Sequence, residues 1–317
     1  MAEITVQLTA IDGKMITVNN PLSLTLASET AAACDSLSLR FTAEAPLPEL
    51  ITATVLHAGV KIFFGYLDMQ RETANGNSIT ADVYARSSAC VLVDNEAEPF
   101  TYLSPSAEAL YVLHARPFGF ENRLPALYCE ADYAVEKGTS CYGAVNRFVY
   151  GISGKSIRIS PEGALYLPDG KGSLPLDKKD ILREIRTVSR GGVCHRIDYK
   201  TEGDRQYRHH IKSRRLERLG IQSSKKLNLA SLPAWQRAFT LKRQLYDAAR
   251  EYRKAELLVS GAIFSELYTP VTYLSPVFGS IDGYYVDGVR ITLDGNGWRT
   301  QFTLLKQQEW EEINYVA

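Results

Sequence analysis

The chain has 317 residues, and because a typical single domain has roughly 100–200, we expect two or three domains. With 45% hydrophobic residues it can bury substantial cores, and its 36 basic and 36 acidic residues balance, so net charge alone does not indicate nucleic acid or an anionic membrane as a partner. Five cysteines without Cys-x-x-Cys spacing indicate neither a zinc site nor a disulfide framework, and they fit a reducing compartment.

The charge is unevenly distributed along the chain. Residues 1–150 contain 9 Lys or Arg against 17 Asp or Glu, whereas residues 151–317 contain 27 against 19. Opposite charge on the two halves suits stacking of opposite faces in an assembly, although separately solvated surfaces explain it equally well.

The sequence shows no export or membrane signal. Residues 1–4 lack the basic and apolar regions of a signal peptide, and no apolar run approaches the roughly 18 residues of a membrane span. We therefore expect that the chain is not exported on its own by means of a signal peptide.

Residues 1–103 are expected to form a first β-barrel domain. Apolar residues alternate with polar ones in several short runs, which is the period of a half-buried strand. These runs lie at residues 4–18, 22–26, 37–41, 51–56 and 60–66.

Residues 104–175 are expected to form a linker helix and a small α/β insert. Ser104-Pro105 has the Ser cap and first-turn Pro that are typical of a helix start, and the helix should end before Pro117. Residues 133–140 should supply a strand and a helix cap, and a helix and two strands at 156–159 and 164–167 should follow.

Residues 176–317 are expected to form a second β-barrel domain that carries one long helix at 233–255. Residues 181–188 fit a helix by period or a strand by context, and that choice stays open. Strands are expected at 193–200, 207–212, 256–264 and 270–274. The helix has an apolar stripe at steps of three and four formed by Trp235, Ala238, Phe239, Lys242, Leu245, Ala249 and Tyr252.

One hairpin pattern occurs in both halves and organises the prediction. Gly283-Tyr284 leads through Asp294-Gly295-Asn296-Gly297 into a second strand, and Gly65-Tyr66 leads through Asn75-Gly76-Asn77 in the same way. These turn residues tolerate the positive φ angles that tight hairpins need. We interpret the two copies as a duplicated β-domain, against the alternative that such hairpins recur by chance.

Two motifs suggest ligand binding, and we judge both weak. Residues 151–156 end in Gly-Lys-Ser, but they run from helix to strand, whereas a phosphate-binding loop runs from strand to helix. A basic run resembles a track for a phosphate backbone, yet strand alternation explains it as the solvated face of a hairpin, and Tyr207 is its lone aromatic residue. The run comprises Arg205, Arg208, His209, His210, Lys212, Arg214, Arg215 and Arg218.

Other reactive residues do not combine into a catalytic site. His209 and His210, like Cys194 and His195, are adjacent on a strand and should point to opposite faces, which argues against a metal site and against a nucleophile with its base. Glu96 and Glu98 are better explained as solvated loop carboxylates than as an acid and base pair. We predict that the protein is not an enzyme and has no catalytic, cofactor-binding or metal-binding residues.

The order of several short motifs resembles that of baseplate hub proteins of phage tails and contractile injection systems, the late control protein D type. These motifs are Phe64-Gly65-Tyr66, Ala85-Arg86-Ser87, Asp94-Asn95-Glu96-Ala97-Glu98-Pro99, Ala115-Arg116-Pro117-Phe118-Gly119, Lys137-Gly138-Thr139-Ser140 with Gly163-Ala164-Leu165, Gly220-Ile221 and Thr300-Gln301-Phe302-Thr303-Leu304. The resemblance covers most of the chain. It implies two similar barrels, a small insert and no active site.

The resemblance also implies a set of partners. A hub of this type is a homotrimeric ring that joins the tail tube protein to the central spike protein and contacts other baseplate proteins. DNA or effectors pass through its lumen without specific binding. Such a protein is located in the virion tail baseplate and is assembled in the cytoplasm of the bacterial host.

The insert offers an alternative function. Tyr133-x-Val135-x-x-Gly138-Thr139-Ser140, together with Leu165-x-Leu167-Pro168, looks like a peptidoglycan-binding LysM module, although it lacks the second helix of that module. The alternative is a LysM-like module of a cell-wall-active protein, with weak peptidoglycan contact.

Overall fold

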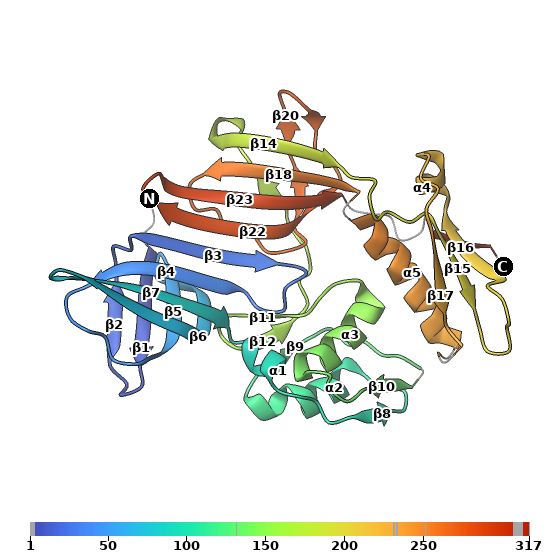
Figure 1. Ribbon diagram of the computed structural model, residues 1–317, viewed down its shortest axis with the longest axis horizontal. Helices are drawn as coiled ribbons and strands as arrows, with labels where there is room; N and C mark the ends of the chain where they lie inside the picture. The colour runs from blue at the N-terminus through green and yellow to red at the C-terminus, as the bar shows by residue number, and fades with distance from the viewer. Residues whose placement is uncertain are drawn as a thin grey trace.

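The structure is a computed structural model that describes residues 4–130, 132–230, 232, 234–250, 252–306 and 313–316. Figure 1 shows three parts: a large twisted sheet, a small helical part below it, and a helix backed by a smaller sheet at one end. The expected mainly β class with an α/β insert is confirmed. No helix in the described part of the chain is both long enough and apolar enough to cross a bilayer.

Among the described residues, thirteen strands form the large sheet, in the order β14-β18-β23-β22-β3-β4-β7-β6-β5-β1-β2, with β19 beside β22 and β13 beside β19. The strands of the first half are β1 (Ile4–Ala10), β2 (Met15–Val18), β3 (Ser23–Glu29), β4 (Ser36–Ala43), β5 (Leu50–His57), β6 (Val60–Asn75) and β7 (Ser78–Ser87). The strands of the second half are β13 (Leu174–Pro175), β14 (Ile181–Val188), β18 (Arg253–Ser260), β19 (Pro270–Thr272), β22 (Tyr284–Asp294) and β23 (Gly297–Lys306).

Each half of the sheet has its own core because alternate side chains of its strands turn inward. On β1 the residues Ile4, Val6, Leu8 and Ala10 are buried, and the residues between them are partly exposed. The first core contains side chains of β1 to β7, and the second contains side chains of β13, β18, β19, β22 and β23. Trp298 packs against both, so the two cores are neighbours.

The two expected barrels are joined into one sheet. Strand β22 pairs antiparallel with β3, from Gly288 opposite Glu29 to Leu293 opposite Leu24. In the part of the chain that the structure describes, the pairing follows an open path and closes neither half as a separate barrel. The physical reason is that β3 and β22 would each otherwise leave a row of backbone N–H and C=O groups unpaired at an edge.

The two halves nevertheless match strand by strand. The order β3-β4-β7-β6-β5 in the first half corresponds to β14-β18-β23-β22-β19 in the second. The duplicated hairpins, β6–β7 and β22–β23, therefore occupy equivalent places, and each closes with a two-residue turn. The structure supports the interpretation as a duplication.

A β-bulge fixes how the two hairpins align. The register shifts between Leu67 and Met69 in the first hairpin and between Val286 and Gly288 in the second, so the bulged residues are Asp68 and Asp287. Aligned on these aspartates, the turns coincide, and the matched tyrosines are Tyr66 and Tyr285. The sequence alignment of Gly65-Tyr66 with Gly283-Tyr284 was therefore shifted by one residue.

The helical part comprises α1 (Cys90–Asp94), β8 (Phe100–Tyr102), α2 (Ala107–His114), the 3-10 turn η1 (Arg116–Phe118), β9 (Glu121–Arg123), β10 (Tyr133–Val135), α3 (Cys141–Ser153), β11 (Arg158–Ile159) and β12 (Ala164–Tyr166). Helix α3 starts at the expected cap, where Ser140 Oγ accepts from Gly143 N at 3.0 Å. Helix α2 starts later than expected, because Ser106 rather than Ser104 is its N-cap and accepts from Ala109 N at 3.1 Å.

The third part contains β15 (Arg196–Lys200), β16 (His209–Ser213), α4 (Arg214–Arg218), β17 (Ser224–Asn228), α5 (Ala234–Arg250) and β24 (Ile313–Val316). Its strands form a separate sheet in the order β17-β15-β16-β24. Short elements elsewhere are the 3-10 turn η2 (Lys178–Asp180), β20 (Leu274–Ser275) and β21 (Gly279–Ser280). The domain boundaries 1–103, 104–175 and 176–317 stay predictions, and this third part lies inside the last range.

The long helix is shorter than expected, and residues 181–188 are a strand. Helix α5 ends at Arg250, and residues 253–260 continue as β18, where Ala255, Leu257 and Val259 are buried at period two. Of the expected stripe, Leu245 and Ala249 are buried, whereas the side chains of Trp235, Ala238, Phe239 and Lys242, and residue 233, lie outside the described part.

Candidate functional site: a polar junction between the three parts

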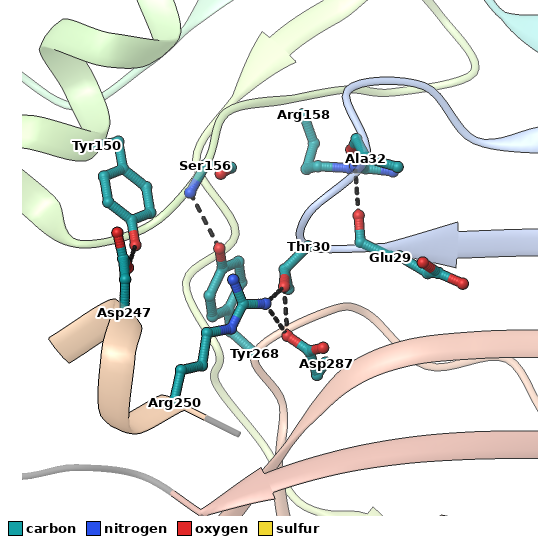
Figure 2. A network of polar contacts seen from close by, with 10 residues as sticks. All are labelled: Glu29, Thr30, Ala32, Tyr150, Ser156, Arg158, Asp247, Arg250, Tyr268 and Asp287. Carbon is teal, nitrogen blue, oxygen red and sulfur yellow. Dashed lines mark hydrogen bonds and ion pairs between the residues drawn. The ribbon is translucent and has the colours of Figure 1, made fainter. Parts of the chain in front are cut away.

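Buried and partly buried polar side chains from all three parts meet near the middle of the molecule. Figure 2 shows this junction, to which the large sheet, the helical part and α5 all contribute. Burying charged groups is costly unless they are paired, so their convergence marks a place where the relative position of the parts is specified.

Arg158, on β11, joins the helical part to the large sheet. Its side chain is 4% exposed, and its guanidinium donates to the carbonyl oxygens of Ala32 at 2.7 Å and Glu29 at 3.2 Å. The same group donates to Ser28 Oγ at 3.0 Å and forms an ion pair with Asp35. Burial by itself disfavours the charged guanidinium, yet the carboxylate of Asp35 holds the pKa of Arg158 above its ordinary value. Arg158 therefore fixes the β3–β4 connection against the insert.

Arg250, the last residue of α5, joins the third part to both halves of the sheet. Its guanidinium contacts Thr30 Oγ1, just after β3, and Asp287 on β22, and the Thr30 hydroxyl also donates to Asp287. Thr30 N donates to the Asp287 carbonyl oxygen at 2.9 Å, where β3 and β22 meet. Burial opposes the charge, and Asp287 holds the pKa of Arg250 above its ordinary value. Asp287 is the bulged residue, so the bulge aims its carboxylate at α5.

A second pair of contacts holds α5 against α3. The Tyr150 hydroxyl donates to Asp247 Oδ1 at 3.0 Å, and the Arg243 guanidinium lies 4.6 Å from the centre of the Tyr150 ring. Arg243 also pairs with Asp247 at 3.3 Å within the helix. Burial and the neighbouring Asp247 carboxylate both raise the pKa of Tyr150, so its hydroxyl remains a donor.

Tyr268, in the segment before β19, lies at the centre of the junction. Its hydroxyl accepts from Ser156 N at 3.0 Å, and its own N–H donates to the Val286 carbonyl oxygen at 2.7 Å. Its ring stacks on that of Tyr285 at 5.8 Å between centroids. Tyr268 has a φ of 66°, a left-handed conformation that costs a non-glycine residue free energy and persists where surrounding contacts impose it.

Two cavities flank the junction. One, of about 400 Å³, lies between the sheet and the helical part and has Phe63, Phe264, Tyr166 and the Arg158 side chain in its wall. The other, of about 440 Å³, lies beside the C-terminal end of α3, with Lys155, Tyr246, Tyr268 and Tyr285 in its wall. The Lys155 ammonium donates to the carbonyl oxygens of Pro168 and Asp169, each at 2.9 Å. The charged groups of Arg158 and Lys155 in these walls already have hydrogen-bond partners within the protein.

The Gly-Lys-Ser segment and the Cys194–His195 pair, which the sequence analysis considered as possible sites, have hydrogen bonds or backbone roles within the fold. Gly154 ends α3 in a left-handed conformation and leads to β11, so the Gly-Lys-Ser segment runs from helix to strand as expected. The Cys194 thiol donates to the Arg196 carbonyl oxygen at 2.8 Å, whereas His195 Nδ1 lies 2.9 Å from the Ser223 carbonyl oxygen.

The carboxylates and the cysteines follow the same pattern. Glu96 accepts from Gly138 N at 2.7 Å, which ties the loop to the insert, and Glu98 is exposed. Among the described residues, no group of three or more His, Cys, Asp or Glu side chains lies close enough together to hold a metal ion. All five cysteines are free thiols, and burial raises the pKa of Cys34 to about 11, which keeps it protonated at neutral pH.

The junction itself was missed by the sequence analysis. Arg158 stands between Ile157 and Ile159 in an apolar strand, which was the one available signal, because a charged residue at an inward position needs a partner. Nothing in the local pattern identified that partner, which is 123 residues away.

The LysM-like reading of the insert has no support from the strand pairing. Strand β10 pairs with β8, whereas the strands after α3 pair with each other and with β9. The insert is therefore built into the rest of the helical part and does not form a sheet of its own from β10 and β12.

Comparison with known proteins finds no matching protein-family model and no matching curated sequence. Solved structures do match over the full chain. A tail protein from Neisseria meningitidis is 17% identical, with a TM-score of 0.77 and 98% of each chain covered. The 43 kDa tail protein of prophage MuSo2 from Shewanella oneidensis is 14% identical, with a TM-score of 0.78, and 99% of this chain and 100% of that one are covered.

A more distant match is a component of the type VI secretion system from E. coli, described as structurally similar to bacteriophage T4 tail proteins. It is 10% identical, with a TM-score of 0.52 over 92% of this chain and 74% of that one. The chain therefore has the fold of phage tail proteins and of a related secretion component.

Proposed function

We propose that the protein is a structural baseplate hub of a phage tail or a tail-like particle, which joins the tail tube to the central spike as a ring. The observation that carries the proposal is the match to two phage tail proteins along nearly the whole of both chains. The junction fits this role, because its polar groups hold three parts of one chain in fixed relative positions.

The duplicated halves suggest how such a ring matches its neighbours. Two similar halves in each chain, repeated three times, place six similar units around one axis, which suits a sixfold tail tube on one side. Threefold symmetry then remains for a spike on the other side. The proposed state is a homotrimer within the virion baseplate, assembled in the host cytoplasm, with tube, spike and other baseplate proteins as partners.

Light scattering on the isolated protein and on its complex with tube and spike proteins tests the proposal. Three copies per assembled ring are expected. A ring of any other stoichiometry would contradict the hub role, as would hydrolysis of murein or of ester, phosphate or glycoside substrates by the purified protein. Pull-down on purified peptidoglycan, lost when residues 133–168 are deleted, would instead favour a cell-wall-binding module.

A further inference from the structure

The third part carries a strongly basic outer face. Residues 189–230 contain eleven Lys or Arg against four Asp or Glu, in a chain whose total charge is zero. We define the basic face as the outer side of β15, β16 and β17 together with the β15–β16 turn and α4. Its cationic residues are Arg196, Lys200, Arg205, Arg208, Lys212, Arg214, Arg215, Arg218 and Lys226.

The fold turns this face away from the core. Ile197 and Ile211 are fully buried and pack with Leu241 and Leu245 of α5 on the inner side of the sheet. Because alternate residues of a strand point to opposite faces, Lys200 and His210 lie on the outer side. Figure 1 shows α5 between this sheet and the rest of the molecule.

Most of these cations have no acidic partner recorded among the residues that the structure describes. Three of the four acidic residues are already paired: Asp198 with Arg196, Asp204 with His209, and Glu217 with Lys212. Several cations have no ion pair within 4.0 Å to an acidic residue in the described part of the chain. These are Lys200, Arg205, Arg208, Arg214, Arg218 and Lys226.

The structure adds what the linear run did not show. Parallel pairing of β17 with β15 brings Lys226 beside the hairpin, and the ammonium groups of Lys200 and Lys226 lie 5.5 and 5.6 Å from the centre of the Tyr207 ring. Cations of three neighbouring strands thus belong to one sheet, with the exposed Tyr207 ring near two of them. Exposed Gln206, Ser224 and Asn228 supply neutral donors of the kind that contact phosphate oxygens.

The chemistry of this face fits phosphate better than it fits a protein partner. Protein interfaces have an apolar or aromatic centre and are depleted of Lys. Between residues 189 and 230, Tyr207 is the one large hydrophobic residue exposed in the described part. Phosphate groups need no apolar centre, and their recognition depends on closely spaced Lys and Arg.

We propose that this basic face binds the sugar-phosphate backbone of DNA without sequence specificity. Each cation that contacts a phosphate releases a condensed counterion, so binding depends steeply on salt. The inference stands on charge and geometry alone and does not depend on the proposed hub function.

The test is fluorescence anisotropy with the full chain and two labelled DNA duplexes of unrelated sequence, titrated from about 50 to about 200 mM salt. Both duplexes are expected to bind with similar affinity, with a Kd on the order of 10⁻⁶ to 10⁻⁴ M at the upper salt concentration. A triple variant, Arg205→Glu, Arg208→Glu and Lys226→Glu, should weaken binding at least tenfold. It should also lower the slope of log affinity against log salt by about 2 to 3, since each contact contributes about 0.9.

The matched control makes the same charge change on other exposed surfaces: Lys14→Glu, Arg116→Glu and Lys137→Glu. It should retain at least half of the wild-type affinity, and circular dichroism should show that both triple variants are folded. Absence of wild-type binding at low salt, equal losses in the two triple variants, or binding independent of salt would overturn the proposal. Self-association that is lost in the first variant, without any DNA binding, would assign the face to a second copy of the chain instead.

Discussion

Arg158 is the residue on which the contact between sheet and insert most depends. Replacing it by Met leaves Asp35 and the carbonyl oxygens of Glu29 and Ala32 without their donor. The Asp35 side chain is 29% exposed, so water partly compensates its charge, and the cost is below that of a fully buried uncompensated charge. We expect Arg158→Met to lower the free energy of unfolding by about 1–3 kcal/mol in urea titrations, as the loss of a partner to partly buried polar groups does.

An exposed arginine of the same part gives the control. Arg123 pairs with Glu121 at 3.3 Å, and both side chains are more than 60% exposed. Arg123→Met should change the unfolding free energy by less than about 1 kcal/mol. Equal effects of the two substitutions would contradict the assignment of Arg158 as a joint.

His114 should make stability depend on pH. It is buried at the end of α2, where its Nε2 lies 2.9 Å from the Tyr102 hydroxyl, and burial lowers its pKa below the ordinary value of 6.5. As pH falls below about 6.5, the unfolded chain gains a proton that the folded chain does not, so the free energy of unfolding decreases.

The His114→Gln variant cannot titrate at this position. We expect a smaller fall in the urea midpoint between pH 7.5 and pH 5.5 than in the wild type, with roughly 6.5 as the upper limit of the affected window. An unchanged fall in His114→Gln would show that other groups cause it.

At the scale of elements, the close approach of β6 to β7 at position 65 requires a glycine. A Cβ atom added to Gly65 would lie 2.1 Å from the Arg86 carbonyl oxygen, and backbone there cannot yield as a side-chain end can. We expect Gly65→Ala to lower the free energy of unfolding by about 1–3 kcal/mol or more, as overpacking of a well-packed site does. Thermal or urea unfolding measures this loss.

The turn of the equivalent hairpin supplies the matched variant. A Cβ atom at Gly295 would have no atom within 4 Å, and Gly295 does not have a positive φ. Gly295→Ala should therefore be neutral or slightly stabilising, by up to about 1 kcal/mol through the unfolded chain. If Gly295→Ala lowers the free energy of unfolding as much as Gly65→Ala does, the close approach of β6 to β7 is not what makes Gly65 necessary.

For the whole molecule, Arg250 is expected to couple the third part to the large sheet. Arg250→Gln removes the charge that faces Asp287, so the third part should open more often without unfolding of the sheet cores. Hydrogen exchange should become faster in residues 193–249 and change little at β4 and β7. Arg40→Gln, which removes an exposed pair with Asp82, should leave both regions as in the wild type. Uniform acceleration over the whole chain would contradict this coupling.

Local patterns were sufficient for much of the fold. The alternation in β1, the hairpin turn at Gly295-Asn296 and the Ser140 cap depend on residues within a few positions of each other, and each was predicted. The end of α5 was not, because the sheet extends β18 back to Arg253, where it pairs with β14 on one side and, from Lys254, with β23 on the other.

The sequence by itself determined the class of the fold, the duplicated hairpin and the absence of a recognisable catalytic pattern. The tertiary structure alone decided that the two halves share one sheet, that Asp287 rather than a neighbouring residue faces Arg250, and that β17 extends the basic run into a surface. The physical reason is separation along the chain. Thr30 and Asp287 are 257 residues apart, and the edge strands β3 and β22 can pair when each half of the sheet has already formed.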